Sequence, residues 1–362
     1  MEMTGRAGSS TDVVVVGGGP AGCAAAIAAQ RAGARVTLLE RETVARDRPG
    51  ETLAPGMEPL LDWLGAGDLL ANATLVRHEG HWVESRDGRR YVAFGRDASG
   101  PWRGFQVWRR TLDGSLRQRA ADLGVDVRLG EVARSILHDR SAAVRGVVLR
   151  HGARVRAHVV IDASGGRHWL ARALGLGVAR LSPRYVATYG YSSRHPEPLT
   201  GHPEPLTGHP ERSERSAVRG RLREGSAVPL FRFDNDGWTW IAPLGERGWA
   251  WTQLSFAGKK TTAGRGADVT WRIARSVAGP GWLIAGDAGA VLDPAASHGV
   301  LRAIMSGARA GLAAAGARRD RDASRASFAG FDGWFRAGVL RDAAILRQTY
   351  AAAMRDEERR AG

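Results

Sequence analysis

Residues 12–22 read DVVVVGGGPAG, an apolar strand that runs directly into a glycine-rich turn. An alanine-rich segment at 23–32 and a second apolar stretch at 35–39 follow, and Glu40 stands at the end of the second stretch. This order is the pattern of a βαβ unit that binds a dinucleotide, with the pyrophosphate on free N–H groups at the positive end of the helix dipole. The sequence therefore predicts a dinucleotide bound across this turn.

The residues of the turn have different physical roles. Gly17 permits the tight turn, Gly19 lets the backbone approach the pyrophosphate, and Gly22 lets the helix press against the sheet. Glu40 is placed to accept hydrogen bonds from the two hydroxyls of a ribose. Each position is expected to contribute to one cofactor site.

Three later segments extend this pattern. Residues 48–53 read RPGETL, a strand ending at Asp162 leads into a Ser-Gly turn, and residues 282–299 read WLIAGDAGAVLDPAASHG. In this order, the motifs resemble those of FAD-dependent monooxygenases with the glutathione-reductase-type fold. The resemblance is greatest to the branch that holds flavin-dependent halogenases, geranylgeranyl reductases and the flavoproteins of quinone-cofactor maturation.

The resemblance implies an FAD site. Asp287 would hydrogen-bond the ribityl chain, and the helix beginning near Gly299 would direct its N-terminus at the flavin, where it stabilises negative charge. Asp162 would close the nucleotide domain over the phosphates, and Arg109 is either a cofactor contact or a solvated arginine at a helix start. The expected cofactor-binding residues are Gly17, Gly19, Pro20, Ala21, Gly22, Glu40, Arg41, Arg48, Arg109, Asp162, Gly286, Asp287, Gly299 and Val300.

The expected architecture is an α/β fold, in which a Rossmann-like FAD-binding domain is interleaved with an antiparallel β-sheet substrate lobe and followed by C-terminal helices. The FAD-binding domain would comprise residues 10–183 and 268–316, interrupted by substrate-lobe strands near 74–95. The substrate lobe would span 184–267, and a helical segment would span 317–362. The heptapeptide HPEPLTG occurs twice in succession from His195, which predicts a mobile surface loop at 194–216 and not a metal site.

Composition limits the other possibilities. The net charge of +15 comes almost wholly from arginines scattered along the chain, and no nucleic-acid-binding motif accompanies them, so no nucleic-acid partner is expected. No run of about 18 apolar residues indicates a transmembrane helix, and the N-terminus lacks the apolar core of a signal peptide. We therefore expect a cytoplasmic protein, and the single cysteine excludes an internal disulfide.

The segment WTWIAP at 238–243 resembles the WxWxIP sequence of flavin-dependent halogenases. Trp238 and Trp240 would point the same way from a strand, either as a wall of the substrate pocket or as ordinary sheet packing. Halogenation itself is disfavoured. No lysine precedes Lys259, and Ala296 stands where tryptophan halogenases carry a glutamate.

The favoured function is an FAD monooxygenase that hydroxylates an electron-rich aromatic, tryptophan- or phenol-like, through a flavin C4a-hydroperoxide. The substrate would be a small molecule or be borne on a carrier or peptide. His298 would hydrogen-bond the oxygen species or accept a ring proton, or else only cap the helix. Electrons would come from NAD(P)H directly or through a partner flavin reductase. A flavin reductase like the geranylgeranyl reductases, and a degenerate non-catalytic flavoprotein, stay open as alternatives.

Overall fold

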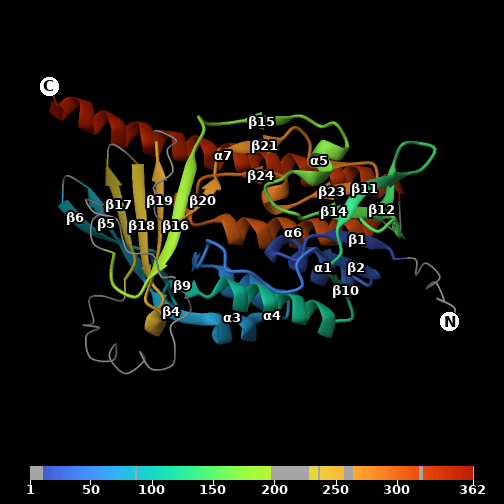
Figure 1. Ribbon diagram of the computed structural model, residues 1–362, viewed down its shortest axis with the longest axis horizontal. Coiled ribbons are helices and arrows are strands. Elements are labelled where there is room, and N and C mark those ends of the chain that lie inside the picture. The colour runs from blue at the N-terminus through green and yellow to red at the C-terminus, as the bar shows by residue number, and fades with distance from the viewer. Residues whose placement is uncertain are drawn as a thin grey trace.

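The computed structural model describes residues 11–85, 88–196, 228–234, 237–256, 264–317 and 321–361. Most of the predicted loop at 194–216 therefore lies outside the described residues. Figure 1 shows a nucleotide-binding half at one end and a large sheet at the other, with the long helix α7 (Arg321–Ala361) running along both. The arrangement confirms the predicted α/β fold class.

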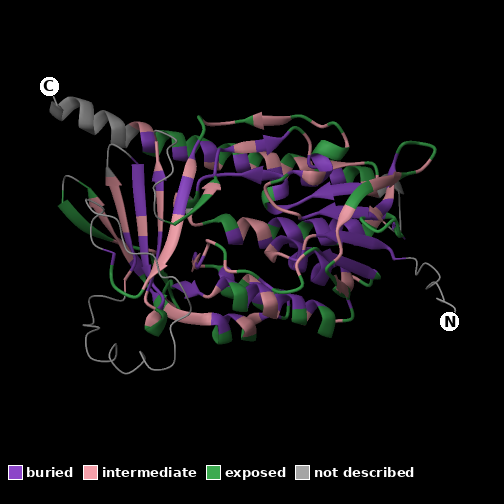
Figure 2. Cartoon of the chain, viewed as in Figure 1, coloured by how far each residue is buried: buried purple, intermediate pink, exposed green. Residues whose placement is uncertain are grey.

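The first sheet holds the glycine-rich turn. Its order is β10-β2-β1-β14-β23-β22, and all neighbours pair in parallel except β22 and β23. The four valines of β1 are buried because helices cover both faces of a parallel sheet, as the purple strands of Figure 2 show. The bounds are β1 Val13–Val16, β2 Val36–Glu40, β10 Asp126–Leu129, β14 Val159–Asp162, β22 Ala278–Gly279 and β23 Trp282–Ile284.

Helices α1 (Pro20–Arg31) and α6 (Gly299–Ala317) cross at small residues. A Cβ built at Gly307 would overlap the carbonyl oxygen of Ala21, and one at Gly311 would overlap that of Ala25. The two backbones can approach this closely only because glycine has no side chain. The crossing fixes the start of α1 relative to the start of α6.

The second sheet has seven strands in the order β20-β16-β19-β18-β17-β5-β6. Its strands β5 and β6 come from a segment inserted among the elements of the nucleotide-binding half, and β5 pairs in parallel with β17. The bounds are β5 Gly80–Ser85, β6 Gly88–Ala93, β16 Val186–Ser192, β17 Leu230–Asp234, β18 Gly237–Pro243, β19 Trp249–Ser255 and β20 Arg265–Asp268.

Shorter elements connect these two sheets. The remaining helices are α2 Met57–Trp63, α3 Gly67–Ala73, α4 Arg109–Asp122 and α5 Trp169–Ala173. The remaining strands are β3 Thr52–Leu53, β4 Thr74–His78, β7 Arg96–Asp97, β8 Gly100–Pro101, β9 Gly104–Val107, β11 Ala133–His138, β12 Val144–Leu149, β13 Arg154–Arg156, β15 Val178–Arg180, β21 Arg272–Ala274 and β24 Ala290–Val291. In the described part of the chain, no helix combines the length and apolarity needed to cross a membrane.

One predicted strand divides in the structure. The alternating pattern at 75–84 predicts a single strand, but β4 ends at His78 and pairs with β9, whereas β5 begins at Gly80 and pairs with β6 and β17. The Nδ1 atom of His78 lies 2.9 Å from the carbonyl oxygen of Gly80 and stabilises the change of direction. The chain therefore passes from one sheet to another within two residues.

The close crossing of α1 and α6 makes a testable prediction. We expect Gly307→Ala to lower the free energy of unfolding by about 1–3 kcal/mol, because the added methyl group forces the helices apart. Gly316→Ala, on the same helix but with no atom within 4 Å of its Cβ position, is the matched control and should not destabilise the protein. Chemical denaturation of both variants measures the difference, and equal stabilities would contradict the packing role.

Candidate active site

The glycine-rich turn has one closed side and one open side. Gly17 has φ of 106°, and a Cβ there would overlap the carbonyl of Ala163, while one at Gly22 would overlap the carbonyl of Gly17. At Gly19, by contrast, no atom lies within 4 Å of the Cβ position. Pro20 begins α1 and no side chain caps its first turn, so N–H groups there are available to an anion.

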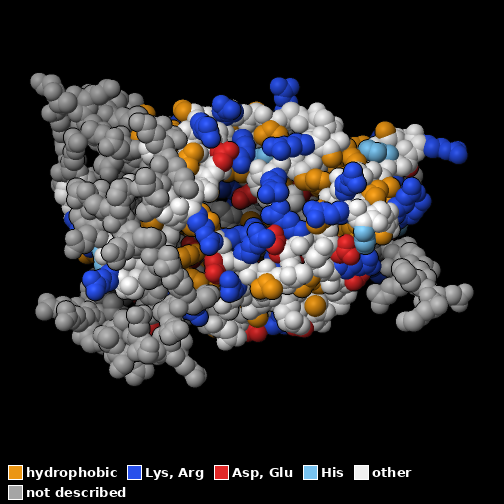
Figure 3. Space-filling model, viewed as in Figure 1, with side chains coloured by type: hydrophobic (Ala, Val, Ile, Leu, Met, Phe, Trp, Pro, Cys, Tyr) orange, Lys and Arg blue, Asp and Glu red, His pale blue; other side chains and the backbone are white. Residues whose placement is uncertain are grey.

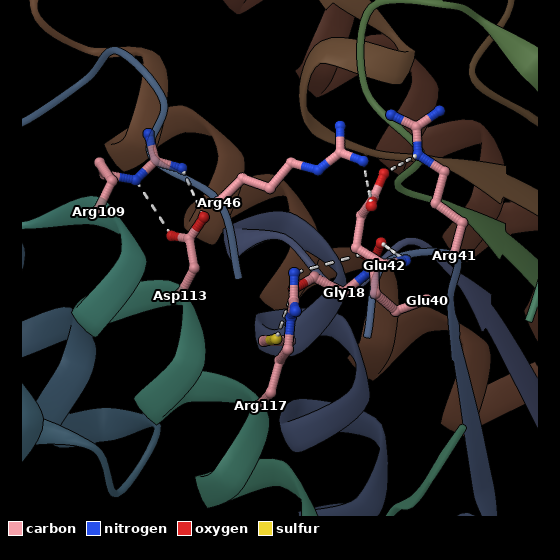
Figure 4. A network of polar contacts seen from close by, with 9 residues as sticks. Gly18, Glu40, Arg41, Glu42, Arg46, Arg109, Asp113 and Arg117 are labelled. Carbon is pink, nitrogen blue, oxygen red and sulfur yellow. Dashed lines mark hydrogen bonds and ion pairs between the residues drawn. The ribbon is translucent and has the colours of Figure 1, made fainter. Parts of the chain in front are cut away.

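Glu40 is held at this turn by a polar network (Figure 4). Its Oε2 atom accepts a hydrogen bond from the N–H of Gly18 at 2.7 Å, and its Oε1 atom accepts one from the N–H of Glu42 at 2.9 Å. Arg117 of α4 donates from Nε to the carbonyl oxygen of Gly18 at 2.7 Å and lies 3.7 Å from Glu40. Carboxylate oxygens accept more than one hydrogen bond, so Glu40 can still accept bonds from a ribose.

Arg117 is a site residue that sequence reasoning missed. It is separated from Gly18 by 99 residues, and it sits within an arginine-rich helix whose pattern does not distinguish it. A cavity of about 480 Å³ opens beside it, between α4, β10 and the loop at 43–45. Its volume is in the range of small-ligand pockets, and its place next to Glu40 suits the adenosine end of a dinucleotide.

The loop after β2 carries the two other predicted arginines. Arg41 is exposed and forms an ion pair with Glu42 at 3.2 Å, as Figure 4 shows. Arg48 is also exposed. Both side chains are therefore on the surface, where they add positive charge that attracts a phosphate-bearing ligand.

Asp287 is reached by solvent but is largely surrounded by protein, which suits a residue that lines a ligand cleft. Its side chain is exposed to solvent, yet the protein around it raises the pKa of the carboxyl group by desolvation, against the guanidinium groups of Arg302, Arg109 and Arg272, which lower it. Figure 3 shows a hollow near the middle of this face, with arginine side chains gathered around it. An exposed acid enclosed by protein suits a hydroxyl-bearing ligand that reaches into the cleft.

The segment at 48–53 meets α4 and α6 at Gly50. A Cβ at Gly50 would lie 2.7 Å from Arg109 Nη1 and 3.5 Å from Val300 Cγ2. Arg109 is buried, donates to the carbonyl oxygen of Pro49 at 2.8 Å and forms a two-pronged ion pair with Asp113 at 3.1 and 3.0 Å. The alternative of a solvated arginine is therefore wrong, and Arg109 ties the 48–53 segment to the start of α4.

Asp162 acts on its own loop. It is completely buried, and its carboxylate accepts hydrogen bonds from the backbone N–H groups of Ser164 at 2.9 Å and Leu170 at 2.8 Å. Because Asp162 has no exposed surface, its contribution to a cofactor site is to hold this loop in position. The nearby Ser164 also acts on this carboxyl group, because a hydrogen bond from its side chain lowers the pKa of Asp162 while burial raises it.

His298 stands immediately before α6. Its side chain is exposed, but surrounding protein still lowers the pKa of the imidazole by desolvation, and Arg302 lowers it further while Asp342 of α7 opposes this. The residue before it, Ser297, has φ of 49°, so the chain turns sharply into the helix. The imidazole is therefore neutral at neutral pH and accessible at the start of the helix.

The two tryptophans of β18 differ in accessibility. Both contact Phe231, so they point the same way as predicted. Trp238 is 1% exposed and donates from Nε1 to the hydroxyl of Tyr350 at 2.8 Å, which removes it from any open pocket in this structure. Trp240 is half-buried and donates to Thr52 Oγ1 at 2.9 Å. Only Trp240 is placed to contact a ligand.

A buried pair links the two halves of the molecule and was not predicted. The hydroxyl of Tyr191, on β16, donates a hydrogen bond to the carboxyl group of Glu51. Burial raises the pKa of Glu51, which the hydrogen bond from Tyr191 opposes, and the Tyr191 ring packs 5.1 Å from Trp108. The RPGETL segment includes Glu51, but only the folded chain shows its partner.

Comparison with known proteins agrees with this geometry. Residues 10–190 match the family model described as "FAD binding domain". The menaquinone reductase of Mycolicibacterium smegmatis is 32% identical over 332 residues, which cover 80% of this chain and 72% of the relative. The 6-methylpretetramide 4-monooxygenase of Streptomyces rimosus is 34% identical over 179 residues, covering 48% of this chain and 43% of the relative. A myxobacterial chondrochloren halogenase structure superimposes with a TM-score of 0.77 at 22% identity, covering 93% of this chain and 82% of that one.

These comparisons define a class of protein: FAD-dependent oxidoreductases with the glutathione-reductase-type fold. The chain belongs to this FAD-binding family, and it shares its fold with the halogenase structure. It is therefore an FAD-dependent enzyme, as the sequence predicts. The open side of Gly19 and the cavity beside Arg117 both fit this cofactor.

The open side of the turn gives a second prediction. We expect Gly19→Val to weaken FAD binding more than tenfold, because its side chain would occupy the space left for the pyrophosphate. The flavin-free variant should unfold at the same temperature as the flavin-free parent, since no protein atom is near the new side chain. Flavin absorbance after gel filtration and thermal unfolding measure the two effects. Full flavin retention in the variant would show that the phosphates lie elsewhere.

Proposed function

We propose that this enzyme is an FAD-dependent monooxygenase that hydroxylates an electron-rich aromatic ring, tryptophan- or phenol-like, on a small molecule or on a carrier or peptide. The observation that carries the proposal is the half-buried indole of Trp240, which donates a hydrogen bond to Thr52. Thr52 belongs to the 48–53 segment, whose Gly50 lies beside Arg109 and Val300. With FAD bound as we expect, this contact would hold an aromatic wall of the seven-stranded sheet near the flavin. Offset or edge-to-face stacking would hold a substrate ring there.

The residues of the cleft would bind FAD, orient the substrate ring and accept the proton that the ring loses. FAD, when bound, supplies the electrons that activate dioxygen. Asp287, together with the N-termini of α1 and α6, would hold the cofactor in place. Trp240 and Tyr191 would exclude water and orient the substrate ring, and the neutral imidazole of His298 would accept the proton that the ring loses.

The electron source belongs to the same proposal. Only one dinucleotide fingerprint is present in the sequence, and FAD occupies it. NAD(P)H would therefore bind transiently at the cleft, or a separate flavin reductase would supply reduced flavin. The arginine side chains around the hollow of Figure 3 suit a phosphate-bearing reductant.

One observation favours a second candidate, a flavin reductase. A relative that is 32% identical across 80% of this chain is named a menaquinone reductase, so reduction of a quinone or of a double bond is the alternative. Halogenation is not favoured, because the chain has no lysine before Lys259 and has Ala296 in place of the expected glutamate. A monooxygenase consumes oxygen for each product molecule and a reductase does not, so oxygen consumption distinguishes the two candidates.

We expect the purified protein to show a flavin absorption spectrum and, after chemical reduction, to consume oxygen faster when a suitable phenol or indole is present. One oxygen atom should appear in the aromatic product by mass spectrometry with ¹⁸O₂. Reduction of menaquinone under anaerobic conditions, with no aromatic hydroxylation in air, would replace the proposal with the reductase. Absence of bound flavin would favour a non-catalytic protein.

His298 gives a prediction about pH. Because desolvation lowers the pKa of His298 below its ordinary value of 6.5, the imidazole can accept a proton throughout the neutral range. Turnover should be level above about pH 7 and fall only as the pH drops through the lowered pKa. His298→Gln should reduce kcat about 100-fold with FAD still bound, and should remove this acidic limb. Unchanged turnover in the variant would exclude His298 from the reaction.

A further inference from the structure

Three rings meet on the face of the seven-stranded sheet that is turned toward the nucleotide-binding half. His81 lies on β5, its ring centroid is 5.8 Å from that of Phe94, just after β6, and 5.7 Å from that of Trp240 on β18. All three side chains are partly exposed. This histidine–aromatic cluster includes Trp240, the residue proposed to stack against the substrate ring.

One atom of the cluster has no partner. His81 Nδ1 is buried and makes no hydrogen bond. A buried polar atom without a partner destabilises a folded protein, so such an atom needs an explanation. The contrast with His78, three residues earlier, is direct: its Nδ1 lies 2.9 Å from the carbonyl oxygen of Gly80, and its Nε2 lies 3.0 Å from Gln106 Nε2.

The wall next to His81 is rigid. Trp240 Nε1 donates to Thr52 Oγ1 at 2.9 Å, and Thr52 Oγ1 donates to Gln106 Oε1 at 3.0 Å. Gln106 is completely buried and is bonded in turn to His78. The indole N–H is therefore already used, and Trp240 is not free to turn its polar edge toward His81. What the cluster offers to a ligand is a fixed ring face and one unpaired nitrogen, which a rotation of the His81 side chain would bring to the ligand.

The ligand group that would pair with His81 is neutral. Burial lowers the pKa of His81, and Arg90 lowers it further, so the imidazole carries no charge at neutral pH. A neutral imidazole has one donor and one acceptor nitrogen. A phenolic hydroxyl both donates and accepts, and therefore pairs with Nδ1 in either tautomer.

We propose that His81 is a specificity-determining residue, whose Nδ1 atom hydrogen-bonds a hydroxyl group on the ring of an aromatic substrate that lies against Trp240. The inference rests on the proposed function for the location of the substrate, and it selects phenols from the aromatic compounds which that function allows. A site built to pair with a hydroxyl group rejects analogues that lack it, because the nitrogen is then left unpaired.

The test compares two probes on the FAD-loaded protein. 4-Propylphenol and propylbenzene differ by one hydroxyl group, and their dissociation constants follow from equilibrium dialysis. We expect His81→Leu to lower the affinity for the phenol relative to propylbenzene about tenfold, the effect of one lost hydrogen bond of ordinary strength. His81→Asn, whose side-chain amide can occupy the position of Nδ1, should retain most of the preference. His151→Leu, an exposed change in a turn of the nucleotide-binding half, is the control and should leave the ratio unchanged.

Stability is the second readout. Leucine removes the unpaired nitrogen at nearly constant volume, so His81→Leu should raise the unfolding temperature, by about 2–4 °C for a domain of this size. A lower unfolding temperature would show that Nδ1 has a structural partner such as bound water, and would overturn the proposal. An unchanged probe ratio in His81→Leu, or no binding of either probe to the parent protein, would also overturn it. If the ratio changes as expected but no oxygen is consumed, the monooxygenase proposal fails and the phenol site stands.

Discussion

The structure depends on the close crossing of α1 and α6. Because glycines at 307 and 311 let α6 press against the backbone of α1, the two helix N-termini are held in one fixed relation. One of these ends is the expected pyrophosphate-binding turn, and the other is the expected flavin-binding end. A single extended cofactor must reach both, so this packing contact sets the dimensions of the active site. The buried side chains around it are mostly alanines, which leave no room for looser packing.

Charge is arranged around that crossing in a consistent way. The acidic groups expected to face the cofactor are each accompanied by arginines from distant elements: Glu40 by Arg117, and Asp287 by Arg302, Arg109 and Arg272. At Asp287 desolvation raises the pKa of the carboxyl group, and the three guanidinium groups oppose that rise. The high arginine content of the chain, which reads as compositional bias along the sequence, thus includes several side chains with defined partners.

The seven-stranded sheet contributes the second wall of the cleft, and its two faces differ. The face toward the nucleotide-binding half carries Trp240, Tyr191 and His81. Trp240 and Tyr191 donate hydrogen bonds to the 48–53 segment, and the ring of His81 lies next to that of Trp240. On this wall, polar atoms are either paired across the two halves, as in Glu51–Tyr191, or left unpaired, as at His81. The paired atoms fix the geometry of the cleft, and the unpaired atom marks where a ligand group is needed.

The sequence by itself determined the nucleotide-binding half, including the roles of Gly17, Gly19 and Gly22, because strand, turn and helix are consecutive there and each glycine answers a local steric demand. Tertiary structure alone decided that Arg117 supports the turn, that Trp238 is sealed by Tyr350 while Trp240 is open, and that Asp162 holds its own loop. These features depend on which distant residues the fold brings together. The spacing of residues along the chain does not predict such contacts, because hydrogen bonds and burial depend on which residues are close in space.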